Sequence, residues 1–137
     1  MPEFKIFYRV SYADTDQMGV VYYANYLVLF ERVRNELLRN ISYPYTRLES
    51  EGVMLPVVEA HVDYKNPAFY DDLLTLTARV GQVKGCRIKM ECEVGNENGQ
   101  LICSGYTVHC FMDRDSRKPV RCPQDLLEIL ENSGDSQ

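Results

Sequence analysis

The sequence predicts an α+β domain in which a five-stranded antiparallel sheet wraps around one long helix. Apolar residues alternate with polar ones near the N-terminus and then recur at every third or fourth position over about 18 residues. Four further strand-like segments follow, and most of them are separated by short turn signals. This order of elements is the one expected when an antiparallel sheet packs on a single helix.

The first strand and the long helix are recognised by the spacing of their apolar residues. In residues 4–12 apolar and polar side chains alternate, and only Phe7 breaks the pattern. Residues 23–41 combine charged positions, Arg34 among them, with an apolar stripe, which predicts an amphipathic helix. The stripe consists of Tyr26, Phe30, Val33, Leu37 and Ile41.

Four strands and a short helix are expected in the rest of the chain. The strands are expected at residues 55–65, 73–83, 86–94 and 101–112. Asn98-Gly99 is a strong hairpin signal between the last two of them. A short helix is expected at residues 125–130, and the tail after about residue 131 is expected to be disordered. Residues 1–137 then form a single domain.

Composition narrows the classes of function and location. The chain has a net charge of −5 and an isoelectric point near 5.0, which argues against a general nucleic-acid-binding surface. No apolar run approaches the roughly 20 residues that a membrane span requires, and the first residues lack the features of a signal peptide. We therefore expect a cytoplasmic protein with no nucleic-acid partner and no membrane span.

The cysteines and histidines do not predict a metal site. The five cysteines form no C-x-x-C pair, which indicates free thiols and neither a disulfide framework nor a zinc site. His61 and His109 are the only histidines, and each lies within a predicted strand. We expect local hydrogen bonds to satisfy both of them, and no bound metal.

Residues 12–26 carry the most informative chemistry in the chain. They read Y-A-D-T-D-Q-M-G-V-V-Y-Y-A-N-Y, so Asp14 and Asp16 lie just before the predicted helix. Unpaired backbone N–H groups and the positive end of the helix dipole gather at such a position. These donors can stabilise an oxyanion while a carboxylate attacks a carbonyl or activates water. Acidic residues before a helix are also common as capping residues, and the spacing alone does not separate the two roles.

The wider pattern resembles a known family. The string D-x-D-x-x-G-V-V-Y-x-A-N-Y is similar to the signature of the 4-hydroxybenzoyl-CoA thioesterase family, including its Tol-Pal-cluster acyl-CoA thioesterase branch. The resemblance continues through P-V-V-E at residues 56–59 and Y-K-N-P-A-F-Y-D-D-L at residues 64–73, and covers about residues 4–130. It implies the hotdog fold and an enzyme without a cofactor that hydrolyses small or medium acyl-CoA thioesters.

The resemblance also implies roles for individual residues. Asp16, the second carboxylate of the motif, is the catalytic one and acts as nucleophile or general base. The backbone N–H of Tyr23 is the oxyanion donor, and Asp14 remains as a turn or capping residue. Some similar members of the branch carry histidine at the position of Tyr23. Tyrosine is a poor base at neutral pH, so we do not expect a histidine-assisted variant of the mechanism.

Further residues are candidates for contacts with the acyl group. An acyl group would meet aromatic and apolar side chains near the helix and the second strand. The candidates are Tyr22, Tyr26, Met54 and Val57. The same side chains could equally belong to an ordinary core, so their positions relative to Asp16 decide between the two interpretations.

The phosphates of CoA would require a basic cluster, because the overall charge is negative. Two clusters are available, and either could be merely solvated charge. The resemblance and the higher density of charge favour the cluster of Arg114, Arg117, Lys118 and Arg121. The alternative is the group of three basic residues at positions 84–89.

Two hypotheses for function and one for assembly follow. The first is the acyl-CoA thioesterase, and the second is a non-catalytic hotdog subunit that binds acyl-CoA or acyl carrier protein. The presence of Asp16 favours the enzyme. The resemblance implies a homodimer with its active sites at the interface, and leaves a homotetramer open. The strands at residues 86–94 and 101–112 are long enough to support edge-to-edge pairing between two chains.

Overall fold

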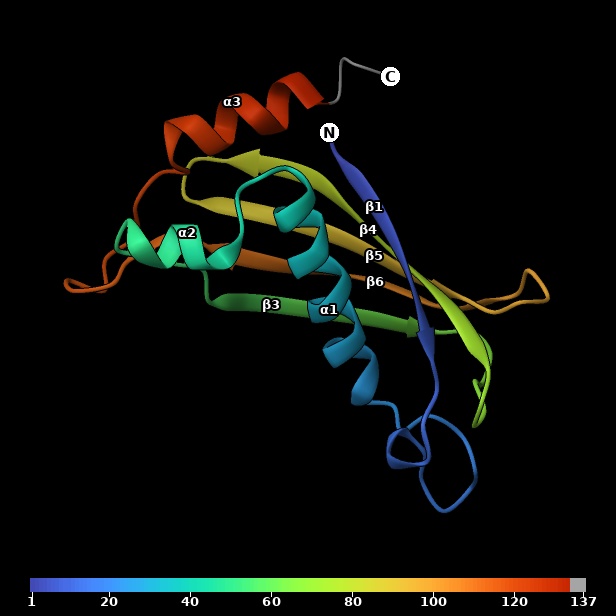
Figure 1. Ribbon diagram of the computed structural model, residues 1–137. Coiled ribbons are helices and arrows are strands. Elements are labelled where there is room, and N and C mark those ends of the chain that lie inside the picture. The colour runs from blue at the N-terminus through green and yellow to red at the C-terminus, as the bar shows by residue number, and fades with distance from the viewer. Residues whose placement is uncertain (134–137) are drawn as a thin grey trace.

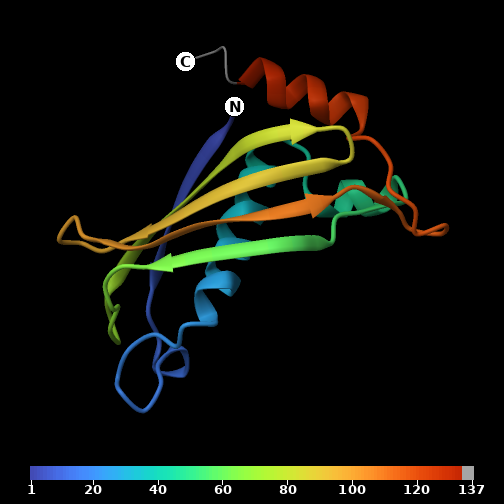
Figure 2. The same ribbon diagram turned by 180° about the vertical axis from the view of Figure 1, so that it is seen from behind.

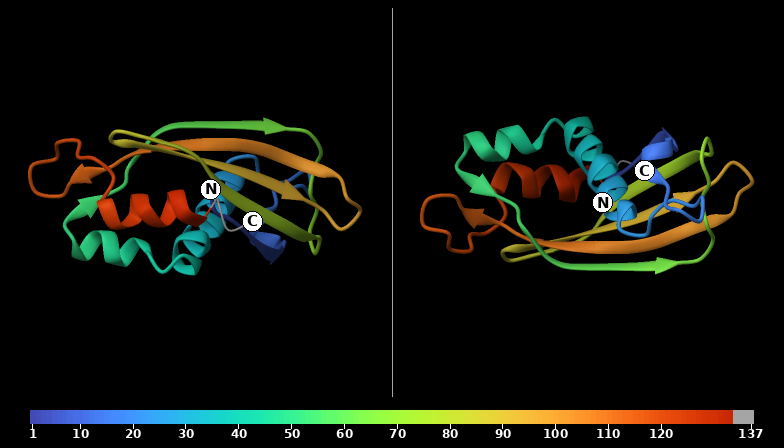
Figure 3. Two further views of the ribbon diagram at one scale, coloured as in Figure 1. Left: turned by 90° about the horizontal axis from the view of Figure 1, so that it is seen from above. Right: turned by 90° about the horizontal axis from the view of Figure 1, so that it is seen from below.

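The computed structural model describes residues 1–133, which form a curved antiparallel sheet with three helices on one of its faces (Figure 1, Figure 3). The helices are α1 (Asn25–Asn40), α2 (Tyr45–Ser50) and α3 (Gln124–Ser133). None of the helices in this part of the chain is both long and apolar enough to cross a membrane.

Five strands form the sheet in the order β1, β4, β5, β6 and β3, and each neighbouring pair is antiparallel (Figure 2). The strands are β1 (Glu3–Arg9), β3 (Val57–Tyr64), β4 (Leu73–Lys84), β5 (Arg87–Gly95) and β6 (Leu101–Cys110). A separate two-stranded ladder joins β2 (Val53–Met54) to β7 (Met112–Asp113). The α+β class and the five-stranded antiparallel sheet predicted from the sequence are confirmed.

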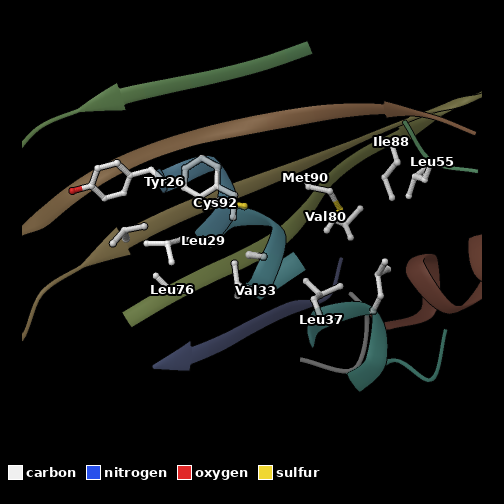
Figure 4. Close-up of a cluster of buried hydrophobic side chains, with 14 of the residues drawn as sticks. Tyr26, Leu29, Val33, Leu37, Leu55, Leu76, Val80, Ile88, Met90 and Cys92 are labelled. Carbon is white, nitrogen blue, oxygen red and sulfur yellow. The ribbon is translucent and has the colours of Figure 1, made fainter. Parts of the chain in front are cut away.

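The long helix packs on the inner face of the sheet through its apolar stripe. Tyr26, Phe30, Val33 and Leu37 are buried, and Ile41 packs at the margin of the core. The sheet side of the core includes Leu76, Val80, Ile88, Met90 and Cys92 (Figure 4). Truncation of a fully buried aromatic side chain such as Phe30 typically costs about 3–5 kcal/mol, so this contact holds the helix on the sheet.

Two strands have other ends than the sequence predicted. In each case a local feature of the chain, a short turn or a proline, interrupts the alternation of apolar and polar residues. The first strand ends at Arg9, and Tyr12 begins a short 3₁₀ turn that Ser11 precedes as N-cap. The strand predicted for residues 55–65 begins only at Val57, because Pro56 has no N–H to donate to a ladder.

The C-terminal helix is longer than the segment of residues 125–130 predicted from the sequence. Leu126 and Leu130 are buried in the core, which anchors the helix to the rest of the domain. Residues 131–133 belong to this helix. The predicted disordered tail otherwise concerns residues 134–137, which lie outside the described residues.

The strand order corrects the expectation for edge-to-edge pairing. β5 lies between β4 and β6, and β6 lies between β5 and β3, so the strands predicted at residues 86–94 and 101–112 are interior strands. Alternation of apolar residues does not report whether a strand has a free edge, which is why the expectation was wrong. The sheet edges are β1 and β3. Every residue of β3 except Val62 is exposed, because α1 packs mainly on β1 and β4.

β3 and β6 approach each other closely at Gly105. A Cβ atom at this position would lie 2.0 Å from the His61 carbonyl oxygen and 3.1 Å from the Phe30 ring. Real Cβ atoms do not approach a backbone oxygen so closely, so glycine is required by the spacing between the strands.

A buried histidine links β6 to the segment before β3. His109 is 1% exposed, and its Nδ1 donates to the Leu55 carbonyl oxygen at 3.2 Å. Its Nε2 therefore accepts from the Thr107 hydroxyl at 2.8 Å, and that hydroxyl oxygen accepts from Arg34 Nη1 at 3.4 Å. Burial, and after it the charge of Arg34, lowers the pKa of His109 to about 4. The imidazole is neutral at neutral pH and is satisfied by local hydrogen bonds, as expected.

The low pKa of His109 should therefore make the protein less stable as the pH is lowered. Its folded pKa of about 4 lies below the ordinary value of 6.5, so between these values the unfolded chain binds a proton that the folded chain does not. This group alone should lower the free energy of unfolding by about 2 kcal/mol between about pH 7.5 and about pH 5. Urea unfolding of the native protein and His109→Asn at both pH values measures the effect, since asparagine can still donate to Leu55 but does not titrate. Equal losses of stability in both proteins would contradict this account.

Candidate active site

The acidic turn is a small closed loop between β1 and α1. Thr15 pairs with Val21 across the loop, and the Asp16 N–H donates to the Val20 carbonyl oxygen at 2.9 Å. At the tip, the Gly19 N–H donates to the Asp16 carbonyl oxygen at 3.0 Å. Gly19 has a φ of +78°, which residues other than glycine rarely adopt. The D-x-D-x-x-G spacing therefore has a direct basis in the backbone.

Asp14 holds this loop in place. Its Oδ2 accepts hydrogen bonds from the Tyr8 hydroxyl at 2.7 Å, the Ser11 N–H at 2.8 Å and the Ser11 hydroxyl at 3.0 Å. Its carbonyl oxygen accepts from Tyr22 N and Asn25 Nδ2, both at 2.9 Å. Burial raises the pKa of Asp14, but the hydrogen bonds from Ser11 and Tyr8 outweigh it and hold the pKa below its usual value. The structure thus gives Asp14 the capping role expected from the sequence.

Asp16 has fewer partners than Asp14. Its Oδ1 accepts from the Met18 N–H at 2.8 Å, and within residues 1–133 its Oδ2 accepts no hydrogen bond. The side chain is half-buried. A hydrogen bond with Tyr23 raises the pKa of Tyr22, and the negative charge of Asp16 adds to that shift. Asp16 therefore offers a carboxylate oxygen that no donor in the described residues occupies.

The start of α1 provides unpaired backbone donors. The helix begins at Asn25, with Ala24 as its N-cap, slightly later than predicted. In the described part of the chain, the N–H groups of Tyr23 and Ala24 donate no hydrogen bond. Because the positive end of the helix dipole lies here, these groups can receive a carbonyl oxygen that gains negative charge. The Tyr23 carbonyl accepts from the Tyr64 hydroxyl at 2.9 Å, which ties this corner to β3.

An aromatic groove lies next to these donors. It has a volume of about 310 Å³, and Tyr23, Tyr26 and Tyr64 are among its lining residues. The centroid of the Tyr64 ring lies 5.7 Å from that of Tyr26 and 6.3 Å from that of Tyr23. Burial is the main cause that raises the pKa of Tyr26 to about 12, so its phenol is neutral. The exposed Tyr22 ring, 4.8 Å from the Tyr23 ring, extends the aromatic surface.

The remaining predicted contact residues lie at the other end of the molecule. Met54 belongs to β2, which pairs with β7, and the loop after β7 carries Arg114, Arg117 and Lys118. In Figure 1 this loop projects beside α2, whereas the acidic turn lies beyond the opposite end of α1. Val57 begins β3 at the end away from the acidic turn. Within one chain, these five residues do not meet Asp16.

The outer face of the sheet carries the other residues considered from the sequence. His61 Nε2 lies 3.2 Å from Asp63 Oδ2, and both side chains are exposed. Lys89, from the alternative basic cluster, places its Nζ 4.2 Å from the centre of the Tyr106 ring. Among residues 1–133, no three His, Cys, Asp or Glu side chains gather as they would around a metal ion.

Sequence reasoning missed three residues that shape the site. The Tyr8 hydroxyl binds Asp14, although the alternation indicated only an ordinary strand residue. Asn25 follows the N-cap, and a polar side chain at a helix start is a signal that could have identified it. Tyr64 lies 41 residues from Tyr23 in the sequence, and no local sequence pattern predicts their contact.

The chain is similar to known proteins over most of its length. A family described as the thioesterase-like superfamily matches residues 10–130. The acyl-CoA thioesterase YbgC of Haemophilus influenzae is 38% identical over 119 residues, which cover 86% of this chain and 87% of that protein. The acyl-CoA thioester hydrolase YbgC of Escherichia coli is 30% identical over 119 residues, which cover 87% and 89%.

A solved structure shares the fold. The DHNA-CoA thioesterase from Staphylococcus aureus has a TM-score of 0.92 and 28% identity, and the match covers 98% of this chain and 93% of that chain. The hotdog fold predicted through the family resemblance is confirmed. The family match includes the acidic turn, α1 and every strand after β1, and the chain belongs to the thioesterase-like superfamily.

Proposed function

We propose that this chain hydrolyses acyl-CoA thioesters, with Asp16 as nucleophile or general base and the Tyr23 N–H as oxyanion donor. The proposal rests on one observation: the open Oδ2 of Asp16 lies in the same closed loop that leads to the unpaired donors at the start of α1. Asp14 cannot offer the same chemistry as readily, because three donors already stabilise its negative charge. The activities named for the two YbgC relatives support the proposal.

The proposed reaction begins when the thioester carbonyl oxygen accepts the Tyr23 N–H, which polarises the carbonyl carbon. Asp16 then either attacks this carbon or removes a proton from a water molecule that attacks it. The C–S bond breaks, and the sulfur leaves as the CoA thiolate and takes up a proton. In the direct route a mixed anhydride with Asp16 forms first, and water then hydrolyses it. Both routes yield the free acid and CoA.

The aromatic groove suits a small or medium acyl group. Its volume of about 310 Å³ is at the lower end of ligand pockets, and the exposed rings of Tyr23 and Tyr64 offer flat surfaces for either an aliphatic or an aromatic group, with the buried Tyr26 behind them. The alternative function is a non-catalytic subunit that binds acyl-CoA or acyl carrier protein. An open carboxylate oxygen on Asp16 favours the enzyme, since binding alone does not require it.

We further propose that the active protein is a homodimer formed through β3. In the described part of the chain no strand pairs with the outer edge of β3, and such edges are normally covered or paired. Antiparallel pairing of two copies, centred on the strand, would place Val57 next to the partner subunit's Tyr64. The loop that carries Arg114, Arg117 and Lys118 would then approach the acidic turn of the other chain, where it could receive the phosphates of CoA.

Asp16→Asn should lower kcat by at least about a hundredfold, because it removes the basic or nucleophilic oxygen but keeps the shape of the side chain. Acyl-CoA binding and the melting temperature should change little. Asp14→Asn should retain most turnover, because its amide oxygen can still accept hydrogen bonds from Tyr8 and Ser11 and so keep the loop in place. Its melting temperature should fall instead, because these bonds lose their charged acceptor. Thiol release from an acyl-CoA, measured for both variants beside thermal melts, tests these roles. Similar turnover in the two variants would show that the assignment within the motif is wrong.

Tyr23→Phe should keep most of the activity, because the proposed donor is its backbone N–H and not its phenol. The substitution also retains the aromatic wall of the groove. Steady-state kinetics compares kcat of this variant with that of the native protein. A loss of about a hundredfold or more would instead indicate chemistry by the phenol.

Ala60→Pro should separate the dimer. The Lys65 N–H donates to the Ile102 carbonyl of β6 at 2.9 Å, and donors alternate in direction along a strand, so the Ala60 N–H points to the free edge. Proline removes this donor without removing a bond to β6, and we expect an inactive monomer. Ala60→Ser keeps the N–H and should remain dimeric and active.

Light scattering combined with activity across a dilution series provides the measurement for both Ala60 variants. The native protein and Ala60→Ser should lose activity only as the mass falls. A fully active native species at the mass of one 15.9 kDa chain would rule out the proposed assembly.

A further inference from the structure

A second hollow lies at the end of β3 away from the acidic turn. It has a volume of about 290 Å³ and lies between α1, α2 and the start of β3. Leu38, Leu55 and Val57 are among the residues that give it apolar walls, and Arg34 and His109 provide polar groups. His109 is neutral, so Arg34 is the cation of this hollow.

Arg34 has few partners for a side chain that is withdrawn from solvent. It is half-buried on α1, and within residues 1–133 it forms no ion pair. Its hydrogen bond to Thr107 Oγ1 is long, at 3.4 Å. Glu31 also lines the hollow and its negative charge acts on Arg34, but it is exposed and the two side chains form no ion pair within 4.0 Å. Burial lowers the pKa of Arg34, yet a guanidinium starts from so high a value that it remains charged at neutral pH.

Most donors of this guanidinium are available to a ligand. A guanidinium has five N–H donors, and the one bond to Thr107 uses a single donor. Every fully buried side-chain nitrogen or oxygen in the described residues has a partner, so the other nitrogens of Arg34 are not sealed from solvent, and the side chain lines the hollow. An ordered cation with open donors in an apolar cavity is the arrangement that recognises an oxygen of a ligand.

The neighbours of Arg34 hold it in position. Thr107 donates its proton to His109 Nε2, which leaves a lone pair of the hydroxyl oxygen for Arg34. His109 in turn donates to the Leu55 carbonyl oxygen. The chain of hydrogen bonds therefore fixes one side of the guanidinium and adds no second positive charge.

We infer that this hollow is the far end of the acyl pocket, and that Arg34 selects acyl groups with an acceptor oxygen at the end remote from the thioester. The inference rests on the proposed function. In the proposed dimer Val57, at the wall of the hollow, lies next to the partner subunit's Tyr64, at the wall of the aromatic groove. An acyl group would then run from the acidic turn of one chain to Arg34 of the other.

The chemistry of Arg34 ranks the possible acyl groups. A terminal carboxylate is the best partner, because it accepts two N–H groups from the planar guanidinium at once. A phenolic oxygen accepts fewer hydrogen bonds than a carboxylate, but it still gives the Arg34 guanidinium an acceptor. A hydrocarbon end would displace water from the guanidinium without replacing the hydrogen bonds that the water made, which costs binding energy.

Matched substrate pairs test the inference. Octanoyl-CoA and suberoyl-CoA have the same chain length and differ in a terminal methyl or carboxylate, and benzoyl-CoA and 4-hydroxybenzoyl-CoA differ in one phenolic oxygen. The native protein should prefer the oxygen-bearing member of at least one pair by about 10- to 100-fold in kcat/KM. In Arg34→Met this ratio should fall to about one. The pair that responds identifies the kind of oxygen.

The ratio within a pair separates recognition from damage to the fold, because a general defect lowers both members alike. Arg34→Lys keeps the charge without the planar fork and should retain part of the ratio. Arg39→Met is the matched control, since Arg39 is exposed on the same helix, where it pairs with Glu36 at 2.5 Å. It should keep the native ratio.

Three outcomes would overturn the inference. If the native protein hydrolyses these thioesters without preference, or if Arg34→Met keeps the native ratio in both pairs, Arg34 does not select the acyl group, while the proposed function stands. If the native protein hydrolyses none of the four thioesters, the proposed function and the inference both fail.

Discussion

The hydrogen bonds to Asp14 are the constraint on which the proposed site depends. Its carboxylate binds Tyr8 of β1 and the backbone of Ser11, and its carbonyl oxygen receives donors from Tyr22 and Asn25 at the approach to α1. One residue thus positions the end of the first strand, the acidic loop and the helix start relative to one another. Because Asp14 carries this structural role, Asp16 keeps an open carboxylate oxygen within a rigid loop.

The order of the strands is the second constraint. It leaves β3 at an edge that α1 does not cover, with the aromatic groove at one end of the strand and the Arg34 hollow at the other. Eight residues of extended chain span about 25 Å, so a short acyl group cannot connect the two within one chain. Antiparallel pairing of two β3 strands brings opposite ends together, and for this reason the proposed site requires both chains.

The sequence predicted those features that depend on neighbouring residues. The hairpin at Asn98-Gly99 and the apolar stripe of α1 follow from local turn chemistry and helical period, and both are present. The strand order was not predictable in this way, because the pairing of β3 with β6 depends on a long-range contact at Gly105. Interior and edge strands can share the same alternation.

The same distinction applies to the site. Motif spacing located Asp14 and Asp16 because both lie in one short loop. Tyr64 reaches this loop from a distant strand, and Arg34 is indistinguishable in sequence from the other charged residues of α1. Its proposed role rests on the hollow around it and on the absence of an ion pair to it within residues 1–133.

The most direct test of this account is the structure of the native protein with an unreactive acyl-CoA analogue in which a methylene group replaces the thioester sulfur. The distance between the analogue's carbonyl oxygen and the Tyr23 nitrogen should be about 3 Å, with the Asp16 carboxylate facing the carbonyl carbon. A carbonyl group bound beyond hydrogen-bond reach of Tyr23, with Asp16 turned away from it, would contradict the central claim that this loop carries the chemistry.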